Sequence, residues 1–457
     1  MKHLPKTPRT LTVNRRDFVK GGSLATMMSL MGGVELVAQE AKKDAAADKA
    51  AGPQVKCGVI GLGARGREVL GTLALQKEAT VAAICDTYAA SLRRASEAAP
   101  KATKHSDYQE ILANKDIQAV IIATPTHQHR QIVLDALAAG KHVYCEAPLA
   151  NTIEDAQAIA LAAKAAVKLV FQSGLQLRSD PQRHFLLQFI RSGAMGKNLM
   201  ARTQWNKKLS WRFTSPNPER ERELNWRLRK ETSLGLVGEL GLHQIDAASW
   251  FLNRKPTAVN GFGAVMHWED GREVADTMQA VFEFPGGLTL THGSTLANSF
   301  DSDHEVYFGT DSAIMVRGNK AWMFKEADAP LLGWEVYARK DEFYKETGIA
   351  LVANATKLVA QGDKPVEDAP FSNTPLSYAL EAFVANVNEI GAAVEDFNAT
   401  FNPNDTKALV KYLSEIKRQP AAGFKEGYEA TVIAIKASEA VQKQQRVTIP
   451  KELFALA

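Results

Sequence analysis

Three glycines near the start of the chain have the spacing of a dinucleotide-binding loop. The segment Lys56-Cys-Gly-Val-Ile-Gly-Leu-Gly-Ala-Arg-Gly66 places them directly after a short apolar run. It predicts a buried strand, a tight turn and the first turn of a helix, whose free backbone N–H groups can hold a pyrophosphate. Gly61 would permit the turn, Gly63 would let the phosphates approach the backbone, and Gly66 would let the helix pack against the strand. A glycine-rich turn in an ordinary α/β core has the same spacing, so the loop alone does not decide the function.

An acidic residue supplies the context that the glycines need. A second apolar run, residues 80–85, ends at Asp86, which lies 20 residues beyond Gly66. An acid in this position can bind the ribose 2′-OH of NAD, and it repels the 2′-phosphate of NADP. The pattern therefore predicts NAD as the cofactor and NADP as the less favoured one. Nearby Arg93 and Arg94 are the residues that could reverse this preference.

A second group of residues could move protons. Glu239, His243 and Asp246 are spaced i, i+4 and i+7, which places them on one face of a helix. A carboxylate one turn before an imidazole can orient it and raise its basicity, which suits general acid–base catalysis near neutral pH. An acid at a helix N-terminus and a buried structural histidine would have the same spacing, and the pattern leaves both open.

Strands and helices alternate over residues 55–175. The run 118–124 is almost continuously apolar and rich in β-branched residues, which is typical of a parallel strand buried on both faces. The alternation predicts an α/β domain with a doubly wound, Rossmann-type parallel sheet. Ligands of such sheets bind beyond the carboxyl ends of the strands. We therefore expect one edge of the sheet to gather the polar or constrained segments 61–66, 86, 124–127, 146–148 and 172–174.

The pattern changes from residue 176 onward. An amphipathic helix at 182–192 is followed by alternating segments with short turns such as Pro285-Gly-Gly287. They predict an α+β domain with an open, mainly antiparallel sheet that has one packed and one available face. The expected strands are 199–207, 258–267, 277–284, 288–294, 305–309 and 313–317. Residues 341–372 suggest a wrapping loop, and helices are expected at 374–391, 404–418 and 424–441.

Charge and cysteine content exclude several classes of partner. The chain has 457 residues and a formal charge of +4, and residues 1–38 alone hold six basic and two acidic residues. The remainder is therefore close to neutral, which gives no support for a nucleic-acid or anionic-membrane partner. Cys57, Cys85 and Cys145 fall in or beside expected interior strands and are predicted to be small buried apolar residues. Their spacing does not indicate zinc, and no metal site is expected.

The first residues resemble an export signal. Asn14-Arg-Arg-Asp-Phe-Val-Lys20 is similar to the twin-arginine pattern, and a weakly apolar stretch follows it. We expect residues 1–38 to be a cleavable signal peptide, with retention as a membrane anchor as the alternative, and residues 39–54 to be a flexible linker. The mature protein would then be periplasmic and without stable membrane insertion. Twin-arginine export carries folded proteins, which suits a chain that takes up a cofactor before export.

The motifs together resemble one known family. Gly-x-Gly-x-x-Gly, then Ala-Thr-Pro-x-x-x-His at 123–129 and Glu-x-Pro at 146–148, is similar to the Gfo/Idh/MocA oxidoreductases, the family of glucose–fructose oxidoreductase and inositol dehydrogenase. The resemblance covers nearly all of the chain from residue 55. It implies an NAD-binding domain over 55–175 and a substrate and oligomerisation domain over 176–457, whose C-terminal helices brace both. The family usually has Glu-Lys-Pro with a catalytic lysine, and this chain has Ala147.

The resemblance also implies roles for single residues. The family motif Asp-x-Gly-x-His-x-x-Asp is matched at Gly241, His243 and Asp246, with Glu239 in place of the first acid. His243 would exchange a proton with the substrate hydroxyl, Glu239 or Asp246 would orient it, and Arg178 would lie near the substrate. The implied cofactor-binding residues are Gly61, Gly63, Ala64, Arg65, Gly66, Asp86, Thr124, Pro125, His129, Glu146, Pro148 and Gln172. For His129, a solvated position in the first turn of a helix is the alternative.

Aromatic residues point to a carbohydrate. Trp211 and Trp226 flank a polar stretch and could stack on a sugar ring, although a core position fits them equally well. Trp250 follows helical spacing from His243 and is expected in the core. The mixed-charge run 219–223 is expected to be a solvated helix face.

Three functions remain open from the sequence. The first is an exported NAD(P)-dependent oxidoreductase acting on a sugar or cyclitol hydroxyl, with a tightly bound cofactor that is recycled within the site. The second is an NAD-dependent glycosidase that acts by transient oxidation and elimination. The third is a sugar-binding pseudoenzyme, for which Ala147 is the evidence. The resemblance further implies a homo-oligomer formed through the C-terminal sheet.

Overall fold

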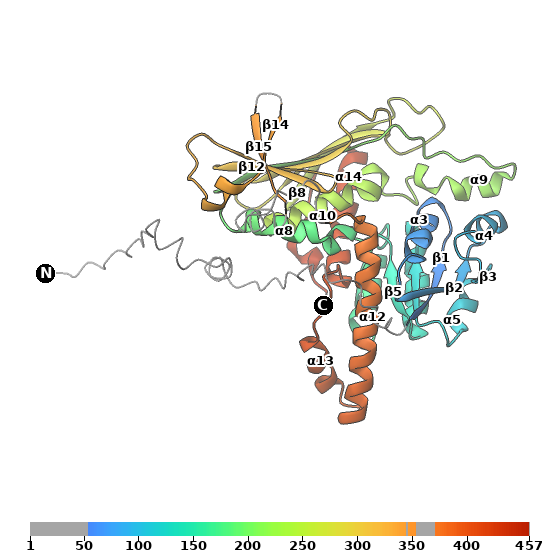
Figure 1. The fold of residues 1–457 in the computed structure, drawn as a ribbon. Coiled ribbons are helices and arrows are strands. Elements are labelled where there is room, and N and C mark those ends of the chain that lie inside the picture. The colour runs from blue at the N-terminus through green and yellow to red at the C-terminus, as the bar shows by residue number, and fades with distance from the viewer. Residues whose placement is uncertain (1–53, 344–345, 353–370, 457) are drawn as a thin grey trace.

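Six parallel strands form the sheet of the N-terminal domain (Figure 1). The computed structural model describes residues 54–343, 346–352 and 371–456. Along the sheet the strand order is β3-β2-β1-β4-β5-β6, which is the Rossmann order. The strands are β1 (Val55–Ile60), β2 (Ala79–Cys85), β3 (Thr103–His105), β4 (Ala119–Ile122), β5 (His142–Cys145) and β6 (Phe171–Ser173). The expected parallel sheet is confirmed.

Both faces of this sheet are covered, which explains the continuous apolar runs. Ile60 and Ile122 face one core cluster, whereas Val59 and Ile121 face another on the opposite side. Successive side chains of a strand point to opposite faces, so a strand covered on both sides needs apolar residues throughout. The covering helices are α3 (Ala64–Leu73), α4 (Ala89–Ala95), α5 (Tyr108–Ala113), α6 (His129–Ala138) and α7 (Ile153–Ala165), and the short 3-10 turn η1 (Thr126–Gln128) precedes α6.

The second sheet has ten strands among the described residues and is mostly antiparallel, as expected. β7 and β10 are parallel neighbours, and every other neighbouring pair is antiparallel. In the order β14-β15-β13-β12-β11-β7-β10-β9-β8-β16, the strands are Lys340–Phe343, Glu346–Ala350, Lys320–Lys325, Ser312–Arg317, Asp303–Gly309, Asn198–Asn206, Thr289–Thr295, Thr277–Glu283, Ala258–Ala264 and Arg446–Thr448.

The sequence prediction missed four of these strands. β13, β14, β15 and β16 were not expected, and β14 and β15 occupy part of the stretch 341–372 that was expected to be a loop. β16 joins the sheet only through long-range pairing with β8, which no local pattern reveals. Residues 353–370 lie outside the described part of the chain.

Helices pack against one face of this second sheet. Along β9, Met278, Ala280 and Phe282 are buried, whereas the alternate residues Gln279 and Val281 are exposed on the open face. The helical elements of the C-terminal domain are η2 (Gln176–Ser179), α8 (Pro181–Arg191), α9 (Pro218–Leu224), η3 (Trp226–Leu228), η4 (Val237–Gly241), α10 (Leu242–Leu252), η5 (Gly333–Tyr337), α12 (Pro375–Thr400), α13 (Thr406–Glu415), α14 (Phe424–Lys443) and η6 (Lys451–Phe454).

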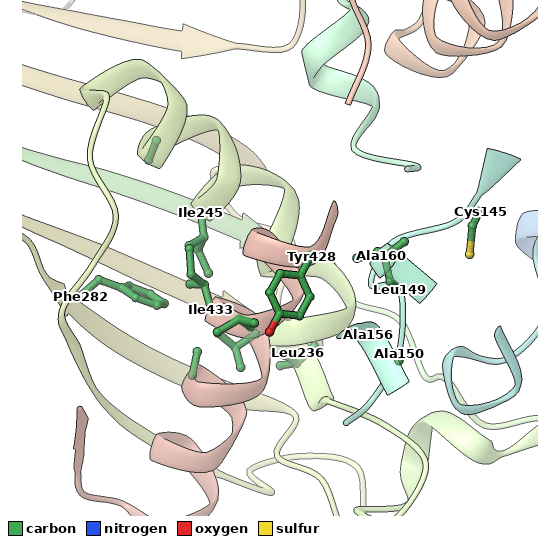
Figure 2. Close-up of a cluster of buried hydrophobic side chains, with 14 of the residues drawn as sticks. Cys145, Leu149, Ala150, Ala156, Ala160, Leu236, Ile245, Phe282, Tyr428 and Ile433 are labelled. Atoms are coloured by element: carbon green, nitrogen blue, oxygen red, sulfur yellow. The ribbon is translucent and has the colours of Figure 1, made fainter. Parts of the chain in front are cut away.

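The C-terminal helices contact both domains, as the family resemblance implies. Figure 2 shows Tyr428 and Ile433 of α14 between the C-terminal residues Ile245 and Phe282 and the N-terminal residue Leu149. The long helix α12 lies along the N-terminal domain (Figure 1), and its buried residues share a core with β1 and α3. The two domains are therefore held together by a continuous apolar core.

The structure also bears on the cysteines and on membrane-spanning helices. Cys57, Cys85 and Cys145 are buried, as predicted, and burial raises the pKa of Cys57 to about 12. Within the described residues, the structure contains no helix with the length and apolar character needed to span a bilayer. The expected signal peptide, residues 1–38, lies outside the described part of the chain. So does the expected linker, residues 39–54, except for Gln54.

Candidate functional site between the two domains

The glycine loop between β1 and α3 forms a cradle. Gly61 has a φ of 90°, and a Cβ there would lie 2.7 Å from the Ala123 carbonyl carbon. A Cβ on Gly66 would lie 1.9 Å from the Gly61 oxygen. A Cβ on Gly63 would have no heavy atom within 4 Å, so this side of the loop is open. The structure thus supports a separate steric reason for each glycine.

The polar groups around the cradle fit a dinucleotide. Helix α3 begins at Ala64 without a side-chain cap at Gly63, so its first N–H groups can bind phosphate oxygens. The Thr124 hydroxyl is buried at the same edge without a hydrogen-bond partner among the described residues. The Asp86 carboxylate, predicted to bind the ribose, accepts hydrogen bonds from the N–H groups of Leu62 and Tyr88, each at 2.8 Å. The acid is therefore held in place at the end of β2.

Arg65, in the first turn of α3, joins the cradle to the rest of the site. Its Nε lies 3.1 Å from Glu146 Oε1, and its Nη2 donates to Gln176 Oε1 at 3.1 Å. Burial raises the pKa of the Glu146 carboxyl, and the Arg65 cation opposes this shift. Ala147, at the position of the family lysine, packs against an apolar cluster that includes Leu242. The structure thus gives the Glu146 carboxylate a cationic partner from the glycine loop.

His243 lies near this cation. Burial lowers the pKa of its imidazole from 6.5 to about 4, and the Arg65 cation lowers it in the same direction. Its Nδ1 is buried and makes no hydrogen bond to any described residue. The imidazole is consequently neutral at physiological pH, which is the form that accepts a proton.

The structure corrects the expected carboxylate partners of His243. Neither Glu239 nor Asp246 forms a hydrogen bond with Nδ1 of the imidazole, which has no partner among the described residues. Glu239 lies in the π-helical turn η4, and Asp246 lies in α10 together with His243. Both carboxylates are held by other groups, which the spacing argument could not anticipate.

The two carboxylates have other partners. Glu239 accepts a hydrogen bond from the Thr126 hydroxyl at 3.2 Å and one from the Leu234 N–H at 3.1 Å. Burial raises the pKa of Glu239, and nearby Arg227 opposes the shift. Asp246 accepts two hydrogen bonds of 2.8 Å from the Arg178 guanidinium. Glu239 therefore joins η4 to the carboxyl edge of β4, and Asp246 joins α10 to η2.

Of the three candidate substrate residues, Arg178, Trp211 and Trp226, the structure does not bring all to one place. Arg178 is bound to Asp246 and lies over the ring of Trp250, which was expected in the core and is partly buried against it. Trp211 is buried in the core, so packing replaces the pocket-lining role that was considered for it. Trp226 lies closer to the site, since its ring centroid is 6.2 Å from that of His127. Of the two tryptophans, Trp226 is therefore the one that lies near the carboxyl edge of β4.

Other predicted cofactor residues contact backbone carbonyl oxygens at or near the carboxyl edge of the parallel sheet. His129 is buried, with Nδ1 3.1 Å from the Pro148 carbonyl oxygen and Nε2 2.9 Å from that of Thr124. It thus links the β4 and β5 ends, in place of either a solvated position or a direct cofactor contact. Gln172 donates from Nε2 to the Ala379 carbonyl oxygen at 2.7 Å. Pro125 precedes η1, and Pro148 carries the carbonyl that His129 contacts.

Two arginines of the site were missed by the sequence interpretation. The guanidinium carbon of Arg227 lies 4.9 Å from the centre of the Trp226 ring. The Arg227 cation is also close enough to lower the pKa of the Glu146 and Glu239 carboxyl groups. Arg220 lies beside Asp86, with Nη2 3.8 Å from Oδ1, although its segment was expected to be a solvated helix face. Arg93 and Arg94, the cations considered for this position, are exposed. The position of Arg220 depends on the packing of α9 across the domain boundary, for which the sequence carries no signal.

Comparison with known proteins identifies the family. Residues 55–173 match the oxidoreductase family with NAD-binding Rossmann fold, and residues 185–323 match the GFO/IDH/MocA C-terminal domain. Levoglucosan dehydrogenase of Pseudarthrobacter phenanthrenivorans is 34% identical over 148 residues, which are 32% of this chain and 36% of the relative. Inositol 2-dehydrogenase of Salmonella paratyphi B is 29% identical over 202 residues, 44% of this chain and 55% of the relative.

A solved structure agrees with the fold. The complex of levoglucosan dehydrogenase with NADH superposes with a TM-score of 0.63 at 21% identity, over 87% of this chain and 99% of that one. The two sequence alignments each span less than two thirds of the relative. The paired matches to the N- and C-terminal domains show that this chain belongs to the GFO/IDH/MocA oxidoreductase family and has its NAD-binding Rossmann domain.

Proposed function

We propose that the protein is an NAD-dependent oxidoreductase that acts on a hydroxyl group of a sugar or cyclitol. The observation that carries the proposal is the convergence of Arg65, from the cofactor cradle, with the partly buried, neutral His243. The names of the relatives, an inositol and a levoglucosan dehydrogenase, support this substrate class. They give no support to the glycosidase or the pseudoenzyme alternative.

The residues of the site divide the chemistry between them. NAD, when bound, accepts or donates the hydride. His243 takes the proton of the substrate hydroxyl during oxidation and returns it during reduction, because its neutral nitrogen is a proton acceptor at working pH. Arg65 fixes the positions of Glu146 and Gln176 at the edge of the cradle.

The charges around the site favour a neutral substrate. Arg65 is paired with Glu146, and Arg178 is paired with Asp246. A carboxylate or phosphate substrate would have to compete with these acids for the guanidinium groups. Hydroxyl groups can bind alongside the pairs, and Trp226 offers an aromatic face for the apolar side of a ring. A neutral polyol therefore fits this charge pattern better than an anionic substrate.

A substrate screen tests the proposal. The purified protein, supplied with NAD, is mixed with free sugars, cyclitols, sugar acids and aryl glycosides, while nicotinamide absorbance and aglycone release are followed. We expect reduction of NAD by at least one neutral sugar or cyclitol, without release of an aglycone. Reaction only with sugar acids, or release of an aglycone without net reduction, would contradict it.

The pH dependence of oxidation should reflect the lowered pKa of His243. Because the neutral imidazole is the active form, kcat/KM should stay level from about pH 8 to about pH 5.5 and fall as the pH approaches about 4. Steady-state rates in a series of buffers measure this profile. As a control, enzyme returned to neutral pH must regain its full rate. An inflection near pH 6.5 would show an ordinary solvated histidine instead.

We also propose that residues 1–38 direct export to the periplasm by the twin-arginine route. The sequence pattern at Arg15 and Arg16 supports this. Because an exported enzyme meets no pool of free NADH, we further propose that the cofactor stays bound and is recycled within the site. Mass analysis of the purified protein tests retention. Cell fractionation of the variant with both arginines changed to Lys tests export, and its accumulation in the periplasm would exclude this route.

The open face of the C-terminal sheet supports the proposed homo-oligomer. Phe262 on β8 and Val281 on β9 are exposed apolar residues of this sheet, at 56% and 40% exposure. Exposed apolar surface on a sheet is a common basis for association between subunits. Light scattering of the purified protein measures its mass, and a monomer at micromolar concentration would contradict this proposal.

A further inference from the structure

The C-terminal domain reaches the adenosine end of the cofactor cradle. In Figure 1, α9 lies beside α3 and α4 of the N-terminal domain. Arg220 of α9 has its guanidinium carbon 4.5 Å from the centre of the Tyr88 ring and its Nη2 3.8 Å from Asp86 Oδ1. One residue thus contacts both the acid expected to bind the ribose and the aromatic ring that follows it.

Arg220 has hydrogen-bonding capacity left over. Its side chain is only 18% exposed, although α9 has no fully buried residue. Its Nη1 donates to Glu223 at 2.8 Å, but its Nε is buried without a partner among the described residues. A buried N–H donor without an acceptor is costly, and such a group in a native structure calls for an explanation.

The position of α9 is fixed by a local network. Asn217 caps the helix by accepting hydrogen bonds from the N–H groups of Glu219 and Arg220. At the other end, the buried Asn225 donates to the carbonyl oxygens of Phe213 and Glu221, each within 2.8 Å. The helix is therefore a built element that holds Arg220 over Asp86.

We propose that Arg220 is a cofactor-binding residue, and that it binds the adenosine half of NAD from the C-terminal domain. Its guanidinium brings a cation and a free N–H donor next to the carboxylate that binds ribose hydroxyls. A dinucleotide in the cradle is then held by residues of both domains, which slows its release. This inference depends on NAD binding by the family fold and is independent of the proposed substrate.

The second consequence concerns the 2′-phosphate. Asp86 repels it, whereas a cation 3.8 Å from the same carboxylate attracts it. Arg220 therefore weakens the discrimination against NADP that the acid alone would give. Its removal should cost a 2′-phosphorylated ligand more affinity than an unphosphorylated one.

Binding of ADP-ribose tests Arg220 without any catalytic step. In titration calorimetry, Arg220→Ala should bind ADP-ribose about tenfold more weakly than the unchanged protein, the scale of one charge-assisted hydrogen bond. In the same variant, the affinity for 2′-phospho-ADP-ribose should fall by a larger factor than the affinity for ADP-ribose. In a stopped-flow chase, NADH should leave Arg220→Ala about tenfold faster. Arg220→Lys should lie between the two, because it keeps the charge but loses the planar contact with Tyr88.

Arg222→Ala is the matched control, because Arg222 is an exposed arginine of the same helix. It should bind ADP-ribose and release NADH as the unchanged protein does, and thermal melting verifies that each variant is folded. Equal ADP-ribose affinity and NADH release in Arg220→Ala and the unchanged protein would overturn the proposal. Equal losses in Arg220→Ala and Arg222→Ala would overturn it too, since they would indicate a general charge effect. A failure of the sugar screen would leave these binding results unaffected.

Discussion

His243→Ala is expected to lower turnover at least about a hundredfold while the protein still binds NADH, because the variant lacks the group that moves the hydroxyl proton. The fold should tolerate the change, since His243 Nδ1 has no hydrogen-bond partner in the described part of the chain that its removal would leave unsatisfied. Steady-state kinetics with the substrate found in the screen, together with NADH fluorescence titration, measure the two effects separately.

His267→Ala supplies the matched control for this prediction. His267 is an exposed histidine of the same domain, and its removal should change neither turnover nor NADH binding. If His243→Ala retained near-normal turnover, His243 would be a structural histidine. If His243→Ala lost NADH binding together with turnover, the loss of turnover would come from the cofactor site and would not support a role of His243 in proton transfer.

Substitutions of the cradle glycines should separate folding from cofactor binding. In Gly66→Ala the new Cβ would meet the Gly61 oxygen at 1.9 Å, so the loop must move, and stability should fall by about 1–3 kcal/mol. In Gly63→Ala the new Cβ meets no heavy atom within 4 Å, and φ of −61° is allowed for alanine. Gly63→Ala should therefore fold normally and bind NADH at least about tenfold more weakly, because its methyl group occupies the approach of the phosphates.

Gly71→Ala is the control for both variants. Gly71 lies in α3, and a Cβ there also meets open space, but it is remote from the start of the helix. Alanine favours the helix by up to about 1 kcal/mol over glycine, so melting should be unchanged or slightly higher and NADH binding unchanged. Denaturant melts and fluorescence titrations distinguish the three variants. Unchanged NADH affinity in Gly63→Ala would mean that the phosphates do not approach this side of the loop.

The N-terminal half of the site could be predicted because its geometry is local. A tight turn needs glycines at fixed offsets, and a strand buried on both faces needs a continuous apolar run, so Gly61, Gly66 and the run at 118–124 revealed their roles. Asp86 was found because the end of β2 lies at a fixed position in this fold. The prediction placed each of these elements within a few residues of its observed bounds.

The partners of the proton-transfer group could not be predicted, because they depend on long-range packing. Glu239 is held by the Thr126 hydroxyl, 113 residues earlier in the chain, and not by His243. Arg178 meets Asp246, 68 residues later, only because η2 packs against α10. Arg220 reaches Asp86 across a domain boundary. In each case the chemical type of the residue could be read from the sequence, whereas its partner depends on the topology.

The contact between α12 and the N-terminal sheet affects how the protein is made. Phe383 packs against Tyr144 of β5 with ring centroids 5.8 Å apart, and Gln76 donates to Ser377, 301 residues later in the chain. During translation, the apolar face formed by β1 and α3 stays uncovered until α12 leaves the ribosome. The N-terminal domain is made first and completed last, so for most of its synthesis the nascent chain carries an exposed surface on which a chaperone can act.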